Sequence, residues 1–190
     1  MATLLLISAL LLRDEGALRS AFEKEIKAKD AAKRVEAVKK LAGVREEKSI
    51  DLLVRSLKDA DLEVRKAAAQ ALEGSTDGAG KAIKPLGEIL VDKKDDLELR
   101  MACAKALAKA RYKSEAFPFF FKAISTIGRE ERQFHKFGAD VTAVLDGYVG
   151  KSFGADKATT ERWEEWWSDN QKALAAADEK ARKEWKEKKE

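Results

Sequence analysis

The sequence predicts an all-α protein, built as a short solenoid of about four helix pairs and closed by a C-terminal capping helix. Two motifs predict this fold, because each recurs three times and the two alternate in phase along the chain. The composition agrees with the motifs. Charged residues make up 38% of the 190 residues, only two are proline, and Ala, Leu, Glu and Lys, which all favour helix, dominate.

The first motif predicts the second helix of each pair, called the B helix. It reads Asp, then Arg four residues later, then small apolar residues three and four beyond the Arg, then Leu seven beyond it. The aspartate suits the N-cap position of a helix. The arginines Arg34, Arg65 and Arg100 are 31 and 35 residues apart. The motif occupies residues 30–41, 61–72 and 96–107.

The second motif predicts the first helix of each pair, called the A helix. Its apolar residues fall at i, i+3, i+4 and i+7, which places them on one helical face. Its anchors Ile50, Ile83 and Phe117 are 33 and 34 residues apart. Since neither helix can bury its apolar stripe alone, the pairs must stack into one continuous core. The expected pairs are residues 17–42, 46–73, 79–110 and 114–146.

The unit length, the Asp and Arg near the B-helix start, and the prolines Pro85 and Pro118 in A helices resemble HEAT repeats, in particular the PBS-lyase-like ones. The resemblance implies a right-handed solenoid with B helices along its concave side. It also implies a structural ladder, in which each arginine pairs with aspartates at the interhelical turns. The fourth B helix departs from the family, because Gly138 stands at the arginine position. The ladder residues are Arg34, Asp61, Arg65, Asp96 and Arg100.

Residues 148–170 resemble the ending of a group of exported bacterial HEAT-repeat proteins, in which a Gly-x-x-Phe-Gly turn precedes a helix with Trp-x-x-Trp-Trp. Trp163, Trp166 and Trp167 are expected to close the open end of the stack, and a binding cage is the alternative. The acidic and basic residues of the C-terminal tail nearly balance, which is typical of a solvated helix. The expected segments are 13–146 for the solenoid, 147–177 for the cap and 178–190 for the charged tail.

Residues 1–12, MATLLLISALLL, form a hydrophobic segment that ends abruptly at Arg13. As a helix it would span about 18 Å, too little to cross a hydrocarbon core of about 30 Å, so no stable membrane span is expected. Its length fits the hydrophobic part of a secretory signal, although no basic residue precedes it and no Ala-x-Ala site follows. We therefore expect a periplasmic or secreted protein. A cytoplasmic location follows if the segment is a structural helix packed on the stack.

The chain is poor in residues that carry chemistry. With one histidine, His135, and one cysteine, Cys103, it can build neither a His-rich metal cage nor a catalytic triad nor an intrachain disulfide. Cys103 lies in an apolar stripe, so we expect a buried thiol. Nothing places two carboxylates in an apolar pocket, as general acid–base catalysis requires. The sequence therefore predicts no catalytic residue, metal site or cofactor, and hence no enzyme.

The predicted function is a non-catalytic protein-binding scaffold, because repeat stacks mainly provide surface. The net charge of +4, from 38 basic and 34 acidic residues, disfavours a dedicated nucleic-acid binder. Two alternatives stay open: a nucleic-acid binder like the HEAT-like alkylpurine DNA glycosylases, and an enzyme subunit resembling bilin lyases. The sequence names neither the partner nor the oligomeric state. Helical spacing predicts a basic concave lining, suited to an acidic protein surface, made by Lys39, Lys66, Gln70, Met101, Lys105 and Lys109.

Overall fold

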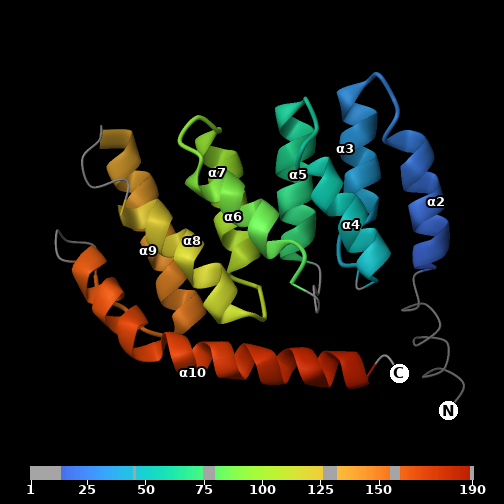
Figure 1. The fold of residues 1–190 in the computed structure, drawn as a ribbon. Helices are drawn as coiled ribbons and strands as arrows, with labels where there is room; N and C mark the ends of the chain where they lie inside the picture. The colour runs from blue at the N-terminus through green and yellow to red at the C-terminus, as the bar shows by residue number, and fades with distance from the viewer. Residues whose placement is uncertain (1–13, 45, 75–79, 126–131, 155–158, 189–190) are drawn as a thin grey trace, which may run out of the picture.

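The computed structural model describes residues 14–44, 46–74, 80–125, 132–154 and 159–188. These residues form nine helices and no strand (Figure 1). The signal-like segment, residues 1–12, lies outside the described residues. The helices are α2 (Glu15–Glu25), α3 (Ala31–Lys40), α4 (Glu47–Ser56), α5 (Leu62–Glu73), α6 (Ile83–Val91), α7 (Leu97–Leu107), α8 (Lys113–Ser125), α9 (Arg132–Val149) and α10 (Thr159–Glu187).

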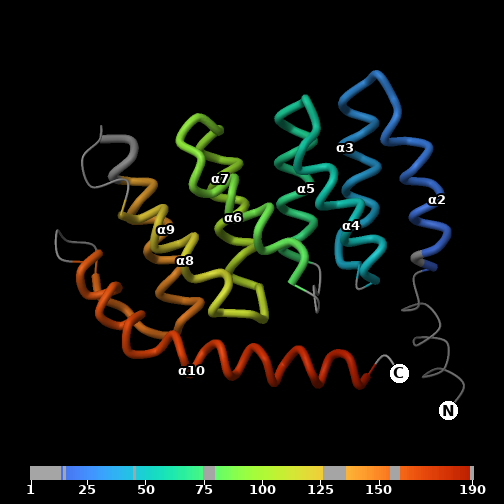
Figure 2. Tube along the Cα trace, viewed as in Figure 1, coloured from blue at the N-terminus to red at the C-terminus, as the bar shows by residue number. Residues whose placement is uncertain are grey.

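The first eight helices form four successive pairs, α2/α3, α4/α5, α6/α7 and α8/α9, set side by side along one direction (Figures 1 and 2). The predicted all-α solenoid is confirmed. The B helices α3, α5 and α7 pack directly on their neighbours, whereas the A helices α2 and α4, or α4 and α6, make little contact with each other. Closer spacing on the B side is the geometry of a stack whose B helices line its inner, concave side.

One pair of A helices, α6 and α8, departs from this spacing and packs closely. Gly87 makes the approach possible. A Cβ atom at this position would lie 2.2 Å from the ring of Phe119, so no larger residue fits without displacing the ring. On the A-helix side, the stack is therefore closed between α6 and α8 and more open between α2 and α4.

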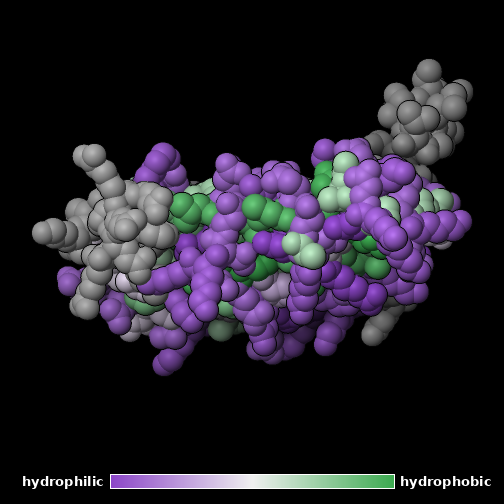
Figure 3. All heavy atoms as spheres, turned by 90° about the horizontal axis from the view of Figure 1, so that it is seen from above, coloured by the Kyte–Doolittle hydropathy of each residue, from purple (hydrophilic) through white to green (hydrophobic). Residues whose placement is uncertain are grey.

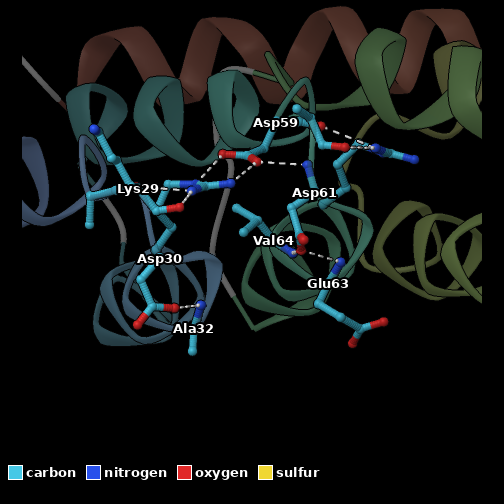
Figure 4. Close-up of polar contacts among 11 residues, drawn as sticks. Lys29, Asp30, Ala32, Asp59, Asp61, Glu63 and Val64 are labelled. Atoms are coloured by element: carbon cyan, nitrogen blue, oxygen red, sulfur yellow. Dashed lines mark hydrogen bonds and ion pairs between the residues drawn. The ribbon is translucent and has the colours of Figure 1, made fainter.

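The B helices begin at the aspartates that the first motif predicts. Asp61 is the N-cap of α5, and its Oδ1 accepts hydrogen bonds from the backbone N–H groups of Glu63 and Val64 at 3.0 and 3.3 Å (Figure 4). Asp30 and Asp96 cap α3 and α7 in the same way. These contacts satisfy N–H groups that have no partner within their own helix.

The apolar stripes of both motifs merge into one continuous core that runs from Phe22 to Trp163. The motif leucines Leu41 and Leu107 are fully buried, and Leu72 is 4% exposed. A continuous core explains how short helices are stable here, because each repeat buries its stripe against the next one.

The 29-residue helix α10 closes the structure by packing on α8 and runs across the lower end of the stack (Figure 1). Gly150 and Gly154, with φ of 77° and 74°, form the turn that leads toward it. The expected division at residue 178 does not coincide with a helix end, and Asp178 is buried. The described part of the expected tail, residues 178–188, is helical to Glu187 and mostly exposed, and Asp178 anchors it by accepting hydrogen bonds from the start of α8.

Candidate functional site

The first rung of the arginine ladder joins α3 to the turn between α4 and α5. Arg34 Nε and Nη2 donate to the two carboxylate oxygens of Asp59 at 3.0 and 2.8 Å, and Nη1 donates to the carbonyls of Ala28 and Lys29. Figure 4 shows Asp59 and Lys29 converging on this contact. The Arg34 hydrogen bond lowers the pKa of Asp59 below its usual range. A bidentate, partly buried pair of this kind fixes one repeat against the next.

The second rung is looser. Arg65 donates to Asp95 Oδ1 at 3.4 Å and to the carbonyls of Asp59 and Ala60. The expected ladder members Asp61 and Asp96 do not accept from these arginines; they cap α5 and α7 instead. An aspartate earlier in each turn is the partner, because the N-cap carboxylate is already committed to the backbone N–H groups of its own helix.

Arg100, at the third ladder position, is fully buried and has a different environment. Its Nε donates to the carbonyl of Leu90 at 3.0 Å, and its guanidinium lies over the ring of Phe137 at 4.4 Å. Like Arg34 and Arg65, it is held by contacts within the chain. The ladder therefore serves the packing of the repeats and offers no open row of cations to an anionic ligand.

The B-helix side carries a groove of about 520 Å³ between α5, α7 and α9, called here the B-helix groove. Its floor is apolar, with the partly exposed Leu97 and Met101 beside Ala102 and Phe137. Its rim carries charges of both signs. The rim residues are Gln70, Glu73, Glu98, Lys105, Lys136 and Asp140.

Three of the six predicted binding residues, Gln70, Met101 and Lys105, come together in this groove. Lys66 lies nearby, but only 14% of its side chain is exposed, and its Nζ lies 2.7 Å from Glu98 and 3.3 Å from Asp96. The hydrogen bonds that Lys66 donates to Glu98 and to other carboxylates raise its pKa, so this ammonium stays charged and paired within the chain.

The other two predicted residues lie elsewhere. Lys39 is exposed and pairs with Glu36 on its own helix at 3.0 Å, and it does not line the B-helix groove. Lys109 lies two residues beyond the end of α7 and borders a small cavity with Leu72 and Ile83. The predicted basic lining is therefore only partly assembled.

Sequence reasoning missed the contribution of α9. Lys136, Phe137 and Asp140 all come from this helix, which lacks the arginine that would have set its register. It also missed the carboxylates Glu73 and Glu98. The rim is consequently mixed in charge rather than basic, and its apolar floor is its most distinctive property.

The described residues contain no group of three or more His, Cys, Asp or Glu side chains placed to hold a metal ion. Cys103 is fully buried, and burial raises the pKa of its thiol to about 12, which disfavours the reactive thiolate. The side chain of His135 lies outside the part that the structure describes.

The tryptophans of the cap pack against neighbouring aromatic rings. Trp163 is fully buried, with its ring edge-on to Phe153 at 4.7 Å and to Trp166 at 5.6 Å. Trp167 stacks on Phe117 at 4.5 Å. Rings packed against one another at these distances form a small aromatic core between α8 and α10.

Stacked helix pairs that share one core and are joined by Arg–Asp contacts define an α-helical repeat protein. A family model described as HEAT repeats matches residues 19–108, which include three copies of the B-helix motif, so this part of the chain consists of HEAT repeats. HEAT repeats generally mediate protein–protein interactions and are typically non-catalytic. No curated protein matches the chain. Among the described helices, none is both long and apolar enough to cross a membrane.

Proposed function

We propose that this HEAT-repeat protein is a non-catalytic scaffold that binds a protein partner in the B-helix groove. The observation that carries the proposal is the partly exposed apolar floor, Leu97 and Met101, at the bottom of a groove of about 520 Å³. Apolar side chains that stay open to solvent inside a concave, polar-rimmed surface mark sites of interaction.

The shape of the groove favours a protein segment as the occupant. It is open and lies along the α-helices of successive repeats, as in the recognition mode where an amphipathic segment places apolar anchors in a helical groove. Its polar rim would surround such anchors and exclude water from them.

The charges of the groove further restrict the kind of partner that it can bind. Lys66 is committed to carboxylates of the chain, and Lys136 pairs with Asp140 at 2.6 Å. Lys105 is exposed and has no ion pair among the described residues. We therefore propose a partner that presents apolar anchors with a carboxylate facing Lys105, which is narrower than a broadly acidic surface.

Affinity capture from the native host tests the proposal, with Met101→Glu compared to the exposed-lysine control Lys94→Glu. A charge on the groove floor should abolish capture of the protein that the unaltered chain retains, because the buried charge would face apolar anchors. Lys94→Glu should retain that protein. Equal capture by both variants, each with an unchanged melting temperature, would move the site away from the groove.

We also propose that the protein is exported, which rests on the length and apolarity of residues 1–12. Fractionation of the native host, followed by N-terminal sequencing, tests this. Mature protein that starts after residue 12 in the periplasm or medium supports export. An intact N-terminus in the cytoplasm contradicts it.

A further inference from the structure

The opposite, A-helix side of the stack holds a second groove, of about 380 Å³, between α2 and α4. It is called here the α2–α4 groove. Its floor is apolar: Phe22 and Leu52 are 3% and 8% exposed, and Ile26 is more open. It exists because α2 and α4 make little contact, whereas α6 and α8 close against each other where Gly87 admits Phe119.

The rim of this groove is where unpaired positive charge gathers. Lys27, Arg55 and Lys58 line it, all three are exposed, and none forms an ion pair among the described residues. Of the two carboxylates in the lining, that of Asp59 accepts hydrogen bonds from Nε and Nη2 of Arg34. The other carboxylate in the lining is that of Glu23, so three cations face one carboxylate that is not already paired.

A neighbouring groove differs from the α2–α4 groove in both its floor and its charges. The groove between α2 and α3 is similar in size, about 390 Å³, but its apolar lining is only Ala28 and Ala32. Its Lys40 is paired with Glu25 at 2.7 Å. Size alone therefore does not distinguish the two, whereas a large apolar floor beneath uncompensated cations does.

We propose that the α2–α4 groove docks an acidic segment of a protein partner, with one apolar side chain on the floor and carboxylates facing Lys27, Arg55 and Lys58. The charges are complementary, and they surround a concave floor that a side chain can enter. Lys81, the nearby lysine at the start of the next repeat, is held by Asp51 and Glu47.

This docking is independent of the B-helix groove, which is formed by other helices on the other side. With both grooves occupied, the solenoid would hold two partners at once, as an adaptor does.

Fluorescence anisotropy tests the docking on the full chain, with a labelled peptide that carries one leucine between glutamates. The test variant is Lys27→Glu/Arg55→Glu/Lys58→Glu. The control is Lys48→Glu/Lys94→Glu/Lys172→Glu, which makes the same change of charge at three exposed lysines without ion pairs outside the groove. Circular dichroism melts establish that both variants are folded.

The unaltered chain should bind this peptide, and the test variant should weaken binding about tenfold or more, because three rim pairs become repulsive. The control should change binding by less than about twofold in salt that screens distant charges. Replacing the leucine of the peptide by glycine should also weaken binding.

Absence of peptide binding by the unaltered chain, or equal weakening by test and control variants, would overturn the proposal. Phosphatidylserine vesicles and duplex DNA are measured in parallel. If either binds through these three residues while the peptide does not, the groove recognises that polyanion and the peptide proposal is wrong. Since the peptide reports on the α2–α4 groove directly, the result stands apart from the capture experiment on the B-helix groove.

Discussion

Asp178 in α10 should be one of the most important charged residues for the stability of the fold. It is 6% exposed and lies 65 residues from the helix that it caps. Its carboxylate accepts hydrogen bonds from the backbone N–H groups of Lys113 and Ser114 at 3.1 and 2.7 Å, and from the hydroxyl of Ser114 at 2.5 Å. These N–H groups begin α8, so Asp178 takes the part of an N-cap side chain.

The cost of Asp178→Ala follows from these contacts. Loss of an N-cap side chain costs about 0.5–2 kcal/mol. Loss of the further hydrogen bond to a charged acceptor, at a buried position, adds roughly 1 kcal/mol or more. We expect a total of about 2–3 kcal/mol, which lowers the melting temperature of a chain of this length by roughly 5–10 °C. Asp178→Asn keeps one acceptor oxygen and should cost about half as much.

Urea unfolding followed by circular dichroism measures this cost, with Glu179→Ala as the matched control. Glu179 is the next residue, is exposed, and pairs with Lys183 one turn later at 2.9 Å, so its loss should cost less than about 0.5 kcal/mol. If Asp178→Ala were no more costly than Glu179→Ala, α10 would not cap α8, and its second half would be the solvated tail that its composition suggests.

Three further predictions concern the core, the ladder and the thiol. Leu107→Ala should destabilise by about 2–5 kcal/mol in urea unfolding, because the side chain is fully buried between repeats; a cost under about 1 kcal/mol would contradict the repeat alignment. The Arg34 hydrogen bond lowers the pKa of Asp59, so the stability that this carboxylate contributes is present above its unfolded pKa and is lost as the pH falls through the lower, folded value. The stability difference between the unaltered chain and Asp59→Asn should therefore be larger at pH 6 than at about pH 2.5, and a constant difference would show that the pair is not formed. Cys103 should resist a disulfide reagent in the native protein and react on unfolding, because burial raises its thiol pKa to about 12; rapid native labelling would show an open thiol.

The fold could be predicted well because its signal is repeated. Two patterns recur along the chain: the spacing of Arg34, Arg65 and Arg100, and the apolar stripes at i, i+3, i+4 and i+7. Both depend only on local helical geometry, and both are repeated in successive helix pairs. Four helix pairs with bounds near the expected ones therefore appear in the structure. The docking of α10 was less predictable, since the contact between Asp178 and Ser114 joins residues far apart in the chain.

The site could be predicted only in part, for a physical reason. Helical spacing tells which face a side chain lies on, and this was sufficient for Gln70, Met101 and Lys105. It does not tell whether a charge is already satisfied by another repeat. Lys66 is held by Glu98, 32 residues later, and Arg34 by Asp59, 25 residues later. Such pairings depend on how repeats stack, so a lysine count overestimates the free positive charge of a solenoid surface.

Exposed surface alone would not have revealed the two grooves either. Figure 3 shows apolar patches scattered among hydrophilic side chains along one face of the stack. What singles out the B-helix groove and the α2–α4 groove is an apolar floor enclosed by charged side chains, and that combination requires the positions of neighbouring helices.

Site-specific photo-cross-linking in the native host tests the central claim most directly, namely that the protein is a scaffold whose partner occupies the B-helix groove. A photoreactive amino acid replaces Lys105 on the groove rim or, in a matched control, the exposed Lys84 on α6. The Lys105 position should give one predominant cross-linked protein, through a peptide with apolar and acidic residues, and the Lys84 position should not give it. The same cross-links from both positions, or none from Lys105, would contradict the account.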